Sequence, residues 1–566
     1  MRRKGIPVIV ALVLIVIVAV VGFGSRLLEK YSYSKEVVDL DEYYGVEEGE
    51  LAILLQNDMI SDRAYVRDGR IYFELNTVKT YLNEGFYADR NEQKILYTTA
   101  LDTATAVFGA REYTDGAGGH ALEYEACFAE GDGIFLAADY VKRFTNYSWL
   151  AFERHLQVYT EWGTKQTMEV TKDTQVRLEG GIKSPILREA EAGETVEVLE
   201  QGEDWSLVKT SDSVIGYLEN KRLDNLQTVT EEPVRDYVEE EYTSVRLPQK
   251  VSLGFHSIGG EGGNSTLDAM LADGNCINVI APTWFSLTDN EGNFRSFASA
   301  WYVESAHARG LQVWGVWDNF NYRNETGADV SAYEVLSSTT KRQKLVQDMV
   351  DTSLGLKLDG INIDFEGLKV DCGEHYIQFL KELSVLCRGS GLILSVDNYV
   401  PLNFNDYYRL DIQGKILDYC IIMGYDEHWH GSGDPGSVAS IEYVSKGLDR
   451  TLEQVPAEKV VNALPFYMIL WKTEGTTVTD EYVTLNHLAD FLQSQNIKLQ
   501  WDETTCQNYG EWNSGTALYQ IWAEDEESIA VKLNVMNARN IGGVAVWRLG
   551  YGTPAAWDLI RAYGSL

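Results

Sequence analysis

The chain has 566 residues, with 48 Lys and Arg against 85 Asp and Glu, so its formal net charge is −37. This acidity argues against nucleic acid as a partner, because phosphate binding needs a basic surface. The length predicts about four structural units, and the six cysteines, none in a C-x-x-C pair, are too few for a disulfide scaffold.

A basic start followed by a long apolar run marks the amino terminus. Arg2, Arg3 and Lys4 precede an uncharged stretch that is long enough to cross a bilayer as a helix. Because the basic residues come first, we expect residues 1–25 to form a single-pass transmembrane anchor, with the bulk of the chain outside the cytoplasm. The alternative is a cleaved signal peptide and a secreted protein, although no A-x-A-like site follows the run.

A weak internal repeat follows a polar, acidic segment, residues 26–50, that we expect to be a stalk. Within residues 51–163, positions 69–79 are similar to positions 132–142. Each copy predicts a turn, a short strand, a helix and a second strand, and hence a small α+β module. The pattern resembles the amino-terminal stalk module of copper amine oxidases. It implies no copper, because no His/Cys ligand cluster accompanies it; a spacer or protein-contact role is expected.

Short strands alternate with turns between residues 166 and 226, which predicts a small β-barrel. The positions that stand out are Gly193, Glu194, Trp205, Gly216, Tyr217 and Leu218. Their pattern resembles a bacterial SH3-like domain, which implies a companion of cell-wall enzymes. Wall binding and a passive spacer both remain open as its role. The acidic, proline-containing residues 227–248 are expected to be a linker.

From residue 249 to residue 566, apolar strands alternate with amphipathic stretches. The predicted strands are 251–255, 277–281, 312–317, 360–365, 392–396, 419–425, 460–464 and 543–547. They are apolar along most of their length, as strands buried on both faces should be. This pattern predicts an α/β fold, a (β/α)₈ TIM barrel. An open doubly wound sheet is the alternative, but the Gly-rich phosphate loop expected after its first strand is missing after Phe255.

The most informative segment is residues 359–366, Asp-Gly-Ile-Asn-Ile-Asp-Phe-Glu. Side chains alternate along a strand, so Asn362, Asp364 and Glu366 should point into the barrel while the apolar residues between them pack outward. Three inward polar groups are costly unless they are used or fully hydrogen-bonded. Glu366 falls at the carboxyl end of the strand, where barrel active sites lie. A structural ion network is the alternative, and Asp359, of opposite parity, is expected to be structural.

This segment resembles the fourth-strand signature D-G-x-D-x-D-x-E of glycoside hydrolase family 18. Further along, residues 423–426, Met-Gly-Tyr-Asp, are similar to the family's M-x-Y-D at the sixth strand, and Trp547 to its eighth-strand tryptophan beneath the sugar pocket. The resemblance covers residues 249–566. Asn362 stands where many chitinases have Asp, a form closest to bacterial spore-cortex and cell-wall N-acetylglucosaminidases.

The resemblance implies a retaining, chitinase-like glycosidase in which the substrate's own acetamido oxygen attacks the anomeric carbon. Glu366 would be the general acid and then the base, with its pKa raised partly by Asp364. Asp364 would also hold the acetamido N–H, and Tyr425 would donate its hydroxyl to the acetamido oxygen. The expected substrate-binding residues are Asn362, Met423, Asp426 and Trp547. Because Asn362 can only hydrogen-bond, we expect Asp364 to be more firmly ionised than in an all-Asp signature.

Weaker candidates lie near other strand ends. The aromatic residues that could form sugar platforms are Trp284, Trp317, Tyr399, Trp429, Tyr467, Trp471 and Trp501. Asp397 and Asn398 lie at the carboxyl end of a predicted barrel strand, where substrate contacts are expected. His428 and His430 lack a third ligand and are a weak metal signal, so we expect no metal and no cofactor.

Together these features predict a membrane-anchored, extracytoplasmic glycosidase. Its expected partner is an N-acetylglucosamine-containing polysaccharide, with peptidoglycan of the bacterial cell wall favoured. Chitin or a host N-glycan is the alternative substrate. A non-catalytic, lectin-like wall protein is the rival of another class, and the retained Glu366, Asp364 and Tyr425 count against it.

Overall fold

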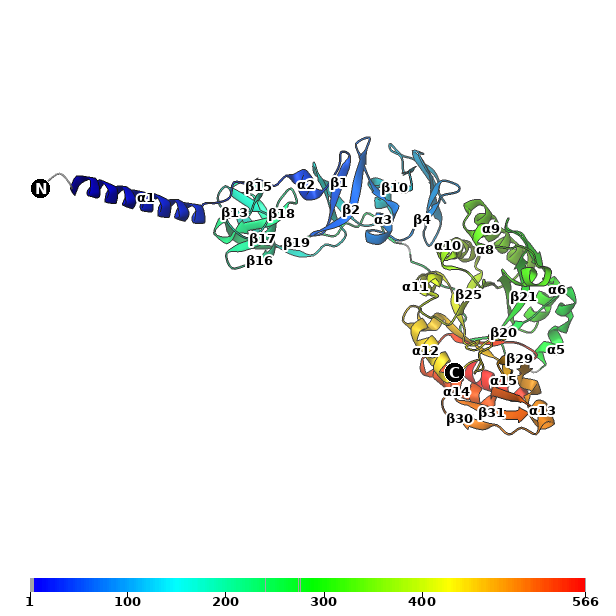
Figure 1. Cartoon of the computed structure of the whole chain (residues 1–566). Coiled ribbons are helices and arrows are strands. Elements are labelled where there is room, and N and C mark those ends of the chain that lie inside the picture. Colours follow the sequence, from blue (N-terminus) through cyan, green and yellow to red (C-terminus); the bar gives the residue numbers. More distant parts are fainter. Residues whose placement is uncertain (1–4, 240, 273, 275, 565–566) are drawn as a thin grey trace. The chain divides into compact units, whose positions relative to one another are not determined.

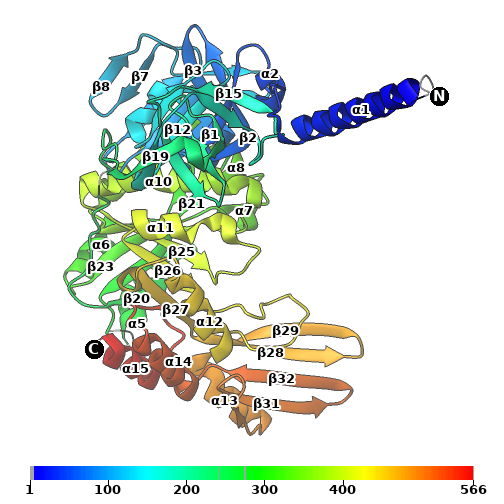
Figure 2. The same cartoon turned by 90° about the vertical axis from the view of Figure 1, so that its left-hand side faces the viewer.

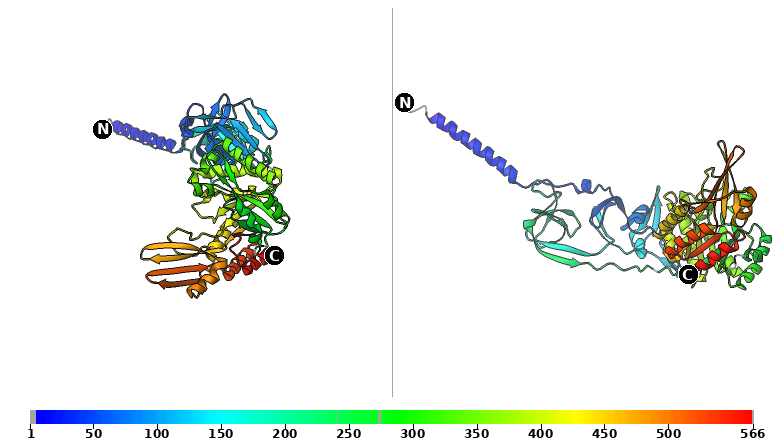
Figure 3. Two further views of the ribbon diagram at one scale, coloured as in Figure 1. Left: turned by 90° about the vertical axis from the view of Figure 1, so that its right-hand side faces the viewer. Right: turned by 90° about the horizontal axis from the view of Figure 1, so that it is seen from below.

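The computed structural model is shown in Figures 1 to 3, and the residues that it describes are 5–239, 241–272, 274 and 276–564. The chain divides into two compact units. The first contains residues 1–86, 106–113 and 120–239, and the second contains residues 87–105, 114–119 and 240–566.

Helix α1 (Gly5–Tyr31) contains the apolar run at the amino terminus (Figure 1). In the described part of the chain, no helix is both long and apolar enough to span a membrane. The structure therefore does not support the transmembrane anchor expected at residues 1–25, and the basic residues 2–4 lie outside the described residues.

The first unit contains the internal repeat, and both copies run from a strand into a helix. Strand β3 (Arg70–Glu74) leads into α3 (Leu75–Tyr81), and β10 (Gly133–Ala137) leads into α4 (Ala138–Val141); the two strands pair antiparallel. They belong to a seven-stranded sheet in the order β11-β12-β1-β2-β3-β10-β9. Its other strands are β1 (Glu50–Leu55), β2 (Asp58–Arg67), β9 (Cys127–Glu130), β11 (Ser148–Ala151) and β12 (His155–Tyr159). The likeness to a copper amine oxidase module stays a prediction.

The second sheet of this unit is the expected small β-barrel, with strands in the order β15-β14-β18-β17-β16-β13-β19. Their bounds are β13 (Thr164–Val170), β14 (Thr174–Arg177), β15 (Ile186–Ala190), β16 (Thr195–Gln201), β17 (Trp205–Lys209), β18 (Ile215–Glu219) and β19 (Leu223–Thr230). Gly216 is required in β18, because a Cβ there would lie 2.7 Å from the Arg177 carbonyl oxygen. Residues of the expected stalk pair with this sheet: the Val38 N–H donates to the Ile186 carbonyl at 2.9 Å, beside α2 (Leu40–Tyr44). That stretch is therefore part of a folded unit.

In the second unit, eight parallel strands close into the predicted TIM barrel. They are β20 (Val251–His256), β21 (Val279–Leu287), β23 (Gln312–Asp318), β24 (Gly360–Asp364), β25 (Ile393–Tyr399), β26 (Tyr419–Met423), β27 (Val460–Pro465) and β33 (Gly543–Trp547). Each overlaps a predicted strand, and the ring closes where β33 pairs with β20. The α/β barrel expected from the sequence is confirmed.

Helices surround the barrel (Figure 2). Their bounds are α5 (Leu267–Leu271), α6 (Ala300–His307), α7 (Asn321–Thr326), α8 (Ala332–Leu336), α9 (Thr339–Leu356), α10 (Gly373–Ser390), α11 (Leu410–Ile416), α12 (Ile441–Leu452), α14 (Glu526–Ala538) and α15 (Pro554–Gly564). Ile361, Ile363 and Phe365 pack in the apolar layer between strands and helices, while Phe255 and Trp314 belong to a separate core inside the barrel. The alternation along β24 therefore has the expected parity.

An insertion that we did not predict from the sequence lies between β27 and β33. It is a five-stranded sheet in the order β29-β28-β32-β31-β30. Its elements are β28 (Tyr467–Glu474), β29 (Thr477–Thr484), α13 (Leu485–Gln495), β30 (Gln500–Asp502), β31 (Gln507–Ser514) and β32 (Ala517–Ala523). Two of its hairpins extend from the barrel in Figure 2. A further short strand, β22 (Phe294–Ser296), pairs antiparallel with β21.

Residues 87–105, which we placed in the repeat module, belong to the compact unit of the barrel. Asp89 is 1% exposed and accepts hydrogen bonds from the Thr339 backbone N–H at 2.6 Å and the Thr339 hydroxyl at 2.7 Å. Glu92 accepts from the Thr340 N–H at 2.7 Å. These carboxylates satisfy N–H groups of the first turn of α9, where helices favour negative charge. The strands nearby are β4 (Phe86–Asp89), β5 (Lys94–Thr98), β6 (Thr103–Val107), β7 (Glu112–Asp115) and β8 (Gly118–Ala121).

Replacing Asp89 should destabilise the barrel although the residue lies outside residues 249–566. Asp89→Ala leaves the buried N–H and hydroxyl of Thr339 without an acceptor, so we expect a loss of about 1–3 kcal/mol in the free energy of unfolding. Urea denaturation of the full chain measures it. The matched control is Asp490→Ala on the exposed face of α13, which should stay within about 0.5 kcal/mol of wild type. Equal stability of both variants would show that the barrel does not depend on this segment.

Candidate active site

A cavity of about 350 Å³ lies at the carboxyl ends of the barrel strands. Its lining residues are Phe255, Ser257, Thr283, Phe320, Asn321, Asp364, Glu366, Asp397, Tyr399, Met423, Tyr425, Asp426, Tyr467, Tyr482, Trp547, Arg548 and Tyr551. The structure thus brings together every site residue expected from the sequence except Asn362, which is fully buried in β24.

Glu366 lies just past the end of β24 and is fixed at three points. The Asn319 side chain accepts a hydrogen bond from the Glu366 N–H at 2.9 Å and donates one to its carbonyl at 2.9 Å. The Tyr399 hydroxyl donates to Glu366 Oε2 at 2.8 Å. Burial raises the pKa of Glu366, the Tyr399 hydrogen bond lowers it in part, and the charges of Asp426 and Asp318 raise it further. The carboxyl therefore keeps its proton to higher pH than an ordinary glutamate, as a general acid needs.

Asp364 precedes Glu366 on the same face of the strand and is surrounded by acidic groups. Burial raises its pKa well above the ordinary value, and the charges of Glu366, Asp397 and Asp318 add to the effect. Its Oδ1 is buried and has no hydrogen-bond partner among the described residues. The raised pKa is opposite to the firm ionisation that we expected, because burial, and after it the charges of Glu366, Asp397 and Asp318, act on Asp364 even with an amide at position 362.

Asn362 acts on this group of carboxyls from within the barrel. Its Nδ2 donates to Ser395 Oγ at 3.0 Å and to Asp397 Oδ1 at 3.1 Å. Burial raises the pKa of Asp397 to about 8, the hydrogen bond from Asn362 opposes the rise, and the charge of Glu366 adds to it. Asn362 therefore orients a second carboxyl and does not face the cavity.

Aromatic residues form the other side of the cavity. The Tyr467 hydroxyl donates a hydrogen bond to Asp426 Oδ1, and the rings of Tyr467 and Tyr425 lie edge to face with centroids 6.1 Å apart. Trp547 packs against Phe255, with centroids 5.6 Å apart. Burial raises the pKa of Asp426, and the Tyr467 hydrogen bond opposes it. A sugar ring can stack on such a wall while its polar groups face the carboxyls.

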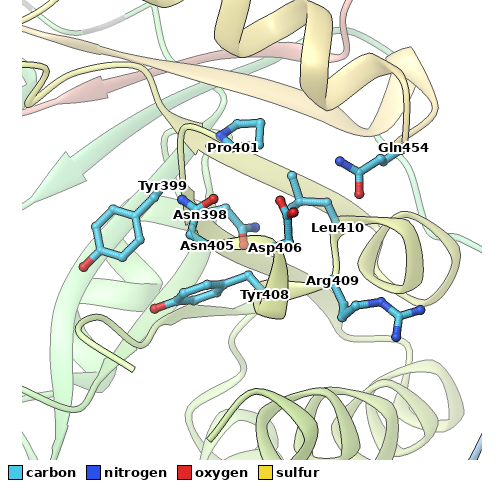
Figure 4. A pocket seen from close by; sticks show the side chains of 9 residues that line it. All are labelled: Asn398, Tyr399, Pro401, Asn405, Asp406, Tyr408, Arg409, Leu410 and Gln454. Atoms are coloured by element: carbon cyan, nitrogen blue, oxygen red, sulfur yellow. The ribbon is translucent and has the colours of Figure 1, made fainter. Parts of the chain in front are cut away.

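Tyr399 is held in place by its neighbours. Tyr408 packs edge to face against it, with ring centroids 5.8 Å apart. Figure 4 shows both hydroxyls pointing to the same side, away from Arg409 and Gln454. Asn398 exchanges two hydrogen bonds of 2.9 Å with Gln413 and lines the separate pocket of Figure 4, not the cavity around Glu366. The substrate contact that we expected from Asn398 stays a prediction.

Sequence reasoning missed two residues at the end of β23. Asp318 accepts hydrogen bonds from the Ser286 hydroxyl at 2.7 Å and from the Asn321 N–H at 2.8 Å, and Asn319 holds the Glu366 backbone. The signal that found Glu366 would also have found them, because an Asp-Asn pair directly follows an apolar strand.

The weaker candidates divide clearly. Among the predicted sugar platforms, Tyr399 and Tyr467 line the cavity. Those outside its lining are Trp284, Trp317, Trp429, Trp471 and Trp501. His428 pairs with Asp434 and His430 pairs with Asp480. Within the described residues, no group of three or more His, Cys, Asp or Glu side chains could hold a metal ion.

The raised pKa of Asp364 predicts a pH-dependent cost to stability. Asp364 has a higher pKa in the folded than in the unfolded chain, so wild type loses stability as pH rises from about 4 through the folded-state pKa. Asp364→Asn stays neutral and avoids this loss. The Tm of the variant minus that of wild type should therefore grow with pH, by roughly 2–4 °C for each kcal/mol. Calorimetry of the full chain across this range measures it, and a constant difference would contradict a raised pKa of Asp364 in the folded chain.

Comparison with known proteins shows which families the chain is similar to. Residues 326–552 match the model of glycosyl hydrolases family 18, and residues 172–224 match that of the bacterial SH3 domain. The chain is 26% identical over 237 residues to the cortical fragment-lytic enzyme of Bacillus anthracis, covering 40% of this chain and 54% of that protein. It therefore spans about half the length of this relative.

A second sequence relative and a solved structure are also similar to this chain. The chain is 25% identical over 296 residues to the uncharacterized glycosylase YvbX of Bacillus subtilis, covering 50% of this chain and 84% of that protein. The crystal structure of the Bacillus cereus spore cortex-lytic enzyme SleL shares the fold, with a TM-score of 0.50 and 22% identity over 60% of this chain and 77% of that one. Residues 326–552 of the barrel thus match glycosyl hydrolases family 18, in one chain with a match to the bacterial SH3 domain, and these matches support a glycosidase.

Proposed function

We propose that the barrel hydrolyses β-linkages next to N-acetylglucosamine in bacterial peptidoglycan, with retention of configuration. The observation that carries this proposal is Glu366, a carboxyl of raised pKa pinned by Asn319 and Tyr399 in one cavity with Asp364 and Tyr425. The cortical fragment-lytic relative and the accompanying SH3 domain favour a wall glycan.

In the first step, Glu366 gives its proton to the glycosidic oxygen as the bond from that oxygen to the anomeric carbon breaks. The substrate's acetamido oxygen forms the new bond to the anomeric carbon, giving an oxazolinium ion. Asp364, whose Oδ1 has no partner among the described residues, accepts the acetamido N–H, and Tyr425 donates to the acetamido oxygen. In the reactive state the proton is on Glu366 and the negative charge is on Asp364, where the bound acetamido N–H and the developing positive charge stabilise the ionised form against the burial that raises its pKa in the free site.

In the second step, the Glu366 carboxylate takes a proton from water, and the water oxygen attacks the anomeric carbon. The bond from that carbon to the acetamido oxygen breaks, so the oxazolinium ring opens and the acetamido group is restored. Each step inverts the anomeric carbon, so the product keeps the β configuration. Trp547 and the aromatic wall hold the sugar face during both steps.

We also propose that the chain works outside the cytoplasm, where the cell wall lies. The apolar run in α1 supports export. Membrane retention and cleavage are the two possible outcomes, and fractionation of cells with an antibody to the barrel separates them.

The role of Glu366 is tested by hydrolysis of purified peptidoglycan. Glu366→Gln keeps the shape but cannot supply a proton, so we expect activity to fall by about 10²–10⁴-fold. Products are read by mass spectrometry, and wild type should release fragments with reducing N-acetylglucosamine ends. Glu304→Gln on α6 is the matched control and should behave as wild type.

The same assay separates the alternatives. Cleavage of chitin oligomers or N-glycans alone would keep the mechanism and move the substrate. Binding of glycan without cleavage by wild type would overturn the proposed hydrolysis in favour of a lectin-like protein.

The Tyr399 hydroxyl should set the alkaline limb of the pH–rate profile. Its hydrogen bond lowers the pKa of Glu366, so Tyr399→Phe raises that pKa and lets the acid keep its proton longer. We expect the alkaline limb of kcat/KM to move to higher pH. Tyr407→Phe, whose hydroxyl bonds to the Leu368 carbonyl at 2.7 Å, should leave the limb in place. Movement to lower pH in Tyr399→Phe would contradict the assignment.

A further inference from the structure

One cation lines a cavity that is otherwise acidic and aromatic. Among the lining residues, the carboxyl groups belong to Asp364, Glu366, Asp397 and Asp426, and the only Lys or Arg is Arg548. The chain as a whole carries a formal charge of −37. An anionic sugar meets mostly carboxyl groups and aromatic rings on this surface, and Arg548 is the point in the cavity where it is attracted.

The backbone around Arg548 is pinned on both sides. The Phe466 N–H donates to the Trp547 carbonyl at 2.8 Å, and the Leu549 N–H donates to the Phe255 carbonyl at 3.0 Å. Arg548 therefore leaves the barrel next to the tryptophan of the sugar wall, at a fixed point between the ends of β33 and β20.

The guanidinium is also held, but without an opposite charge. It stacks on the Tyr551 ring, 4.2 Å from the centroid, and its Nη2 donates to the Tyr551 hydroxyl at 2.6 Å. Within the described part of the chain it forms no ion pair with a carboxylate. A guanidinium has five N–H donors in a rigid fork that matches a carboxylate, so donors remain for a ligand.

We propose that Arg548 binds the carboxylate of a sugar next to the N-acetylglucosamine at the scissile bond. The chemistry that fits is an acidic, alternating glycan in which every second sugar bears a lactyl ether with a free carboxylate, as in the muramic acid of peptidoglycan from which the stem peptides have been removed. A neutral N-acetylglucosamine polymer offers Arg548 no charge to pair with. This assignment rests on the proposed function and names its specificity: the site selects acidic wall glycan over chitin.

The test uses two tetrasaccharide substrates that differ only in the lactyl ether groups. One is an alternating N-acetylglucosamine–N-acetylmuramic acid tetrasaccharide, and the other is the chitin tetrasaccharide. The measured quantity is the ratio of their kcat/KM values. In Arg548→Gln this ratio should fall roughly tenfold to a hundredfold, mainly through KM, because one charge-assisted contact is lost. Arg548→Lys keeps the charge but not the forked guanidinium, so its ratio should lie between those of wild type and Arg548→Gln.

Two controls sharpen the result. Arg90→Gln makes the same charge change at an exposed position and should leave the ratio as in wild type. Conversion of the lactyl carboxylates to neutral methyl amides should lower kcat/KM for wild type but have little effect on Arg548→Gln. An equal loss on both substrates in Arg548→Gln, or a wild-type ratio in that variant, would overturn the proposal.

Binding measurements test carboxylate recognition separately from the proposed hydrolysis. In the Glu366→Gln background, calorimetry measures the Kd of each tetrasaccharide with and without Arg548→Gln. If wild type cleaves neither substrate but the acidic one binds more weakly after Arg548→Gln, hydrolysis is overturned and carboxylate recognition stands. If the acidic substrate is cleaved and its Kd is unchanged by Arg548→Gln, recognition is overturned and hydrolysis stands.

Discussion

The site depends on the repulsion among carboxyl groups that neighbouring barrel strands place together. Asp318 ends β23, Asp364 ends β24 with Glu366 just beyond it, and Asp397 lies near the end of β25. Burial and the like charge of neighbouring carboxyls both disfavour the ionised form of these groups. The pKa values of Asp364, Glu366 and Asp397 are raised accordingly. A proton is thereby kept inside the site, which is the requirement for acid catalysis at neutral pH.

The surrounding structure keeps these groups in place against their repulsion. Ser286 and Asn321 donate to Asp318, Asn362 donates to Asp397, and Tyr399 donates to Glu366. The buried Oδ1 of Asp364 has no hydrogen-bond partner in the described chain. The arrangement is thus incomplete at the one acidic group that the proposed mechanism assigns to the substrate's acetamido N–H, and a bound sugar would complete it.

Much of this could be predicted from the sequence. The eight strands are long apolar runs, and the alternation in residues 359–366 fixed which side chains face inward. The pairing of Asp397 with Asn362 could not be predicted, since register between distant strands decides it. Asp89 was missed because its partners lie some 250 residues further along the chain. The insertion at β28–β32 was missed although β28 is an apolar run, because its other strands β29 and β31 are polar and lack the apolar pattern of the barrel strands.

The anomeric configuration of the first product tests the central claim most directly. Proton NMR during early hydrolysis of a β-linked N-acetylglucosamine oligomer by the full chain distinguishes the two anomers before they interconvert. Glu366 acting with the substrate's own acetamido group predicts the β anomer first, because two inversions retain the configuration. The α anomer as first product would mean direct attack by water and would contradict this account of the site.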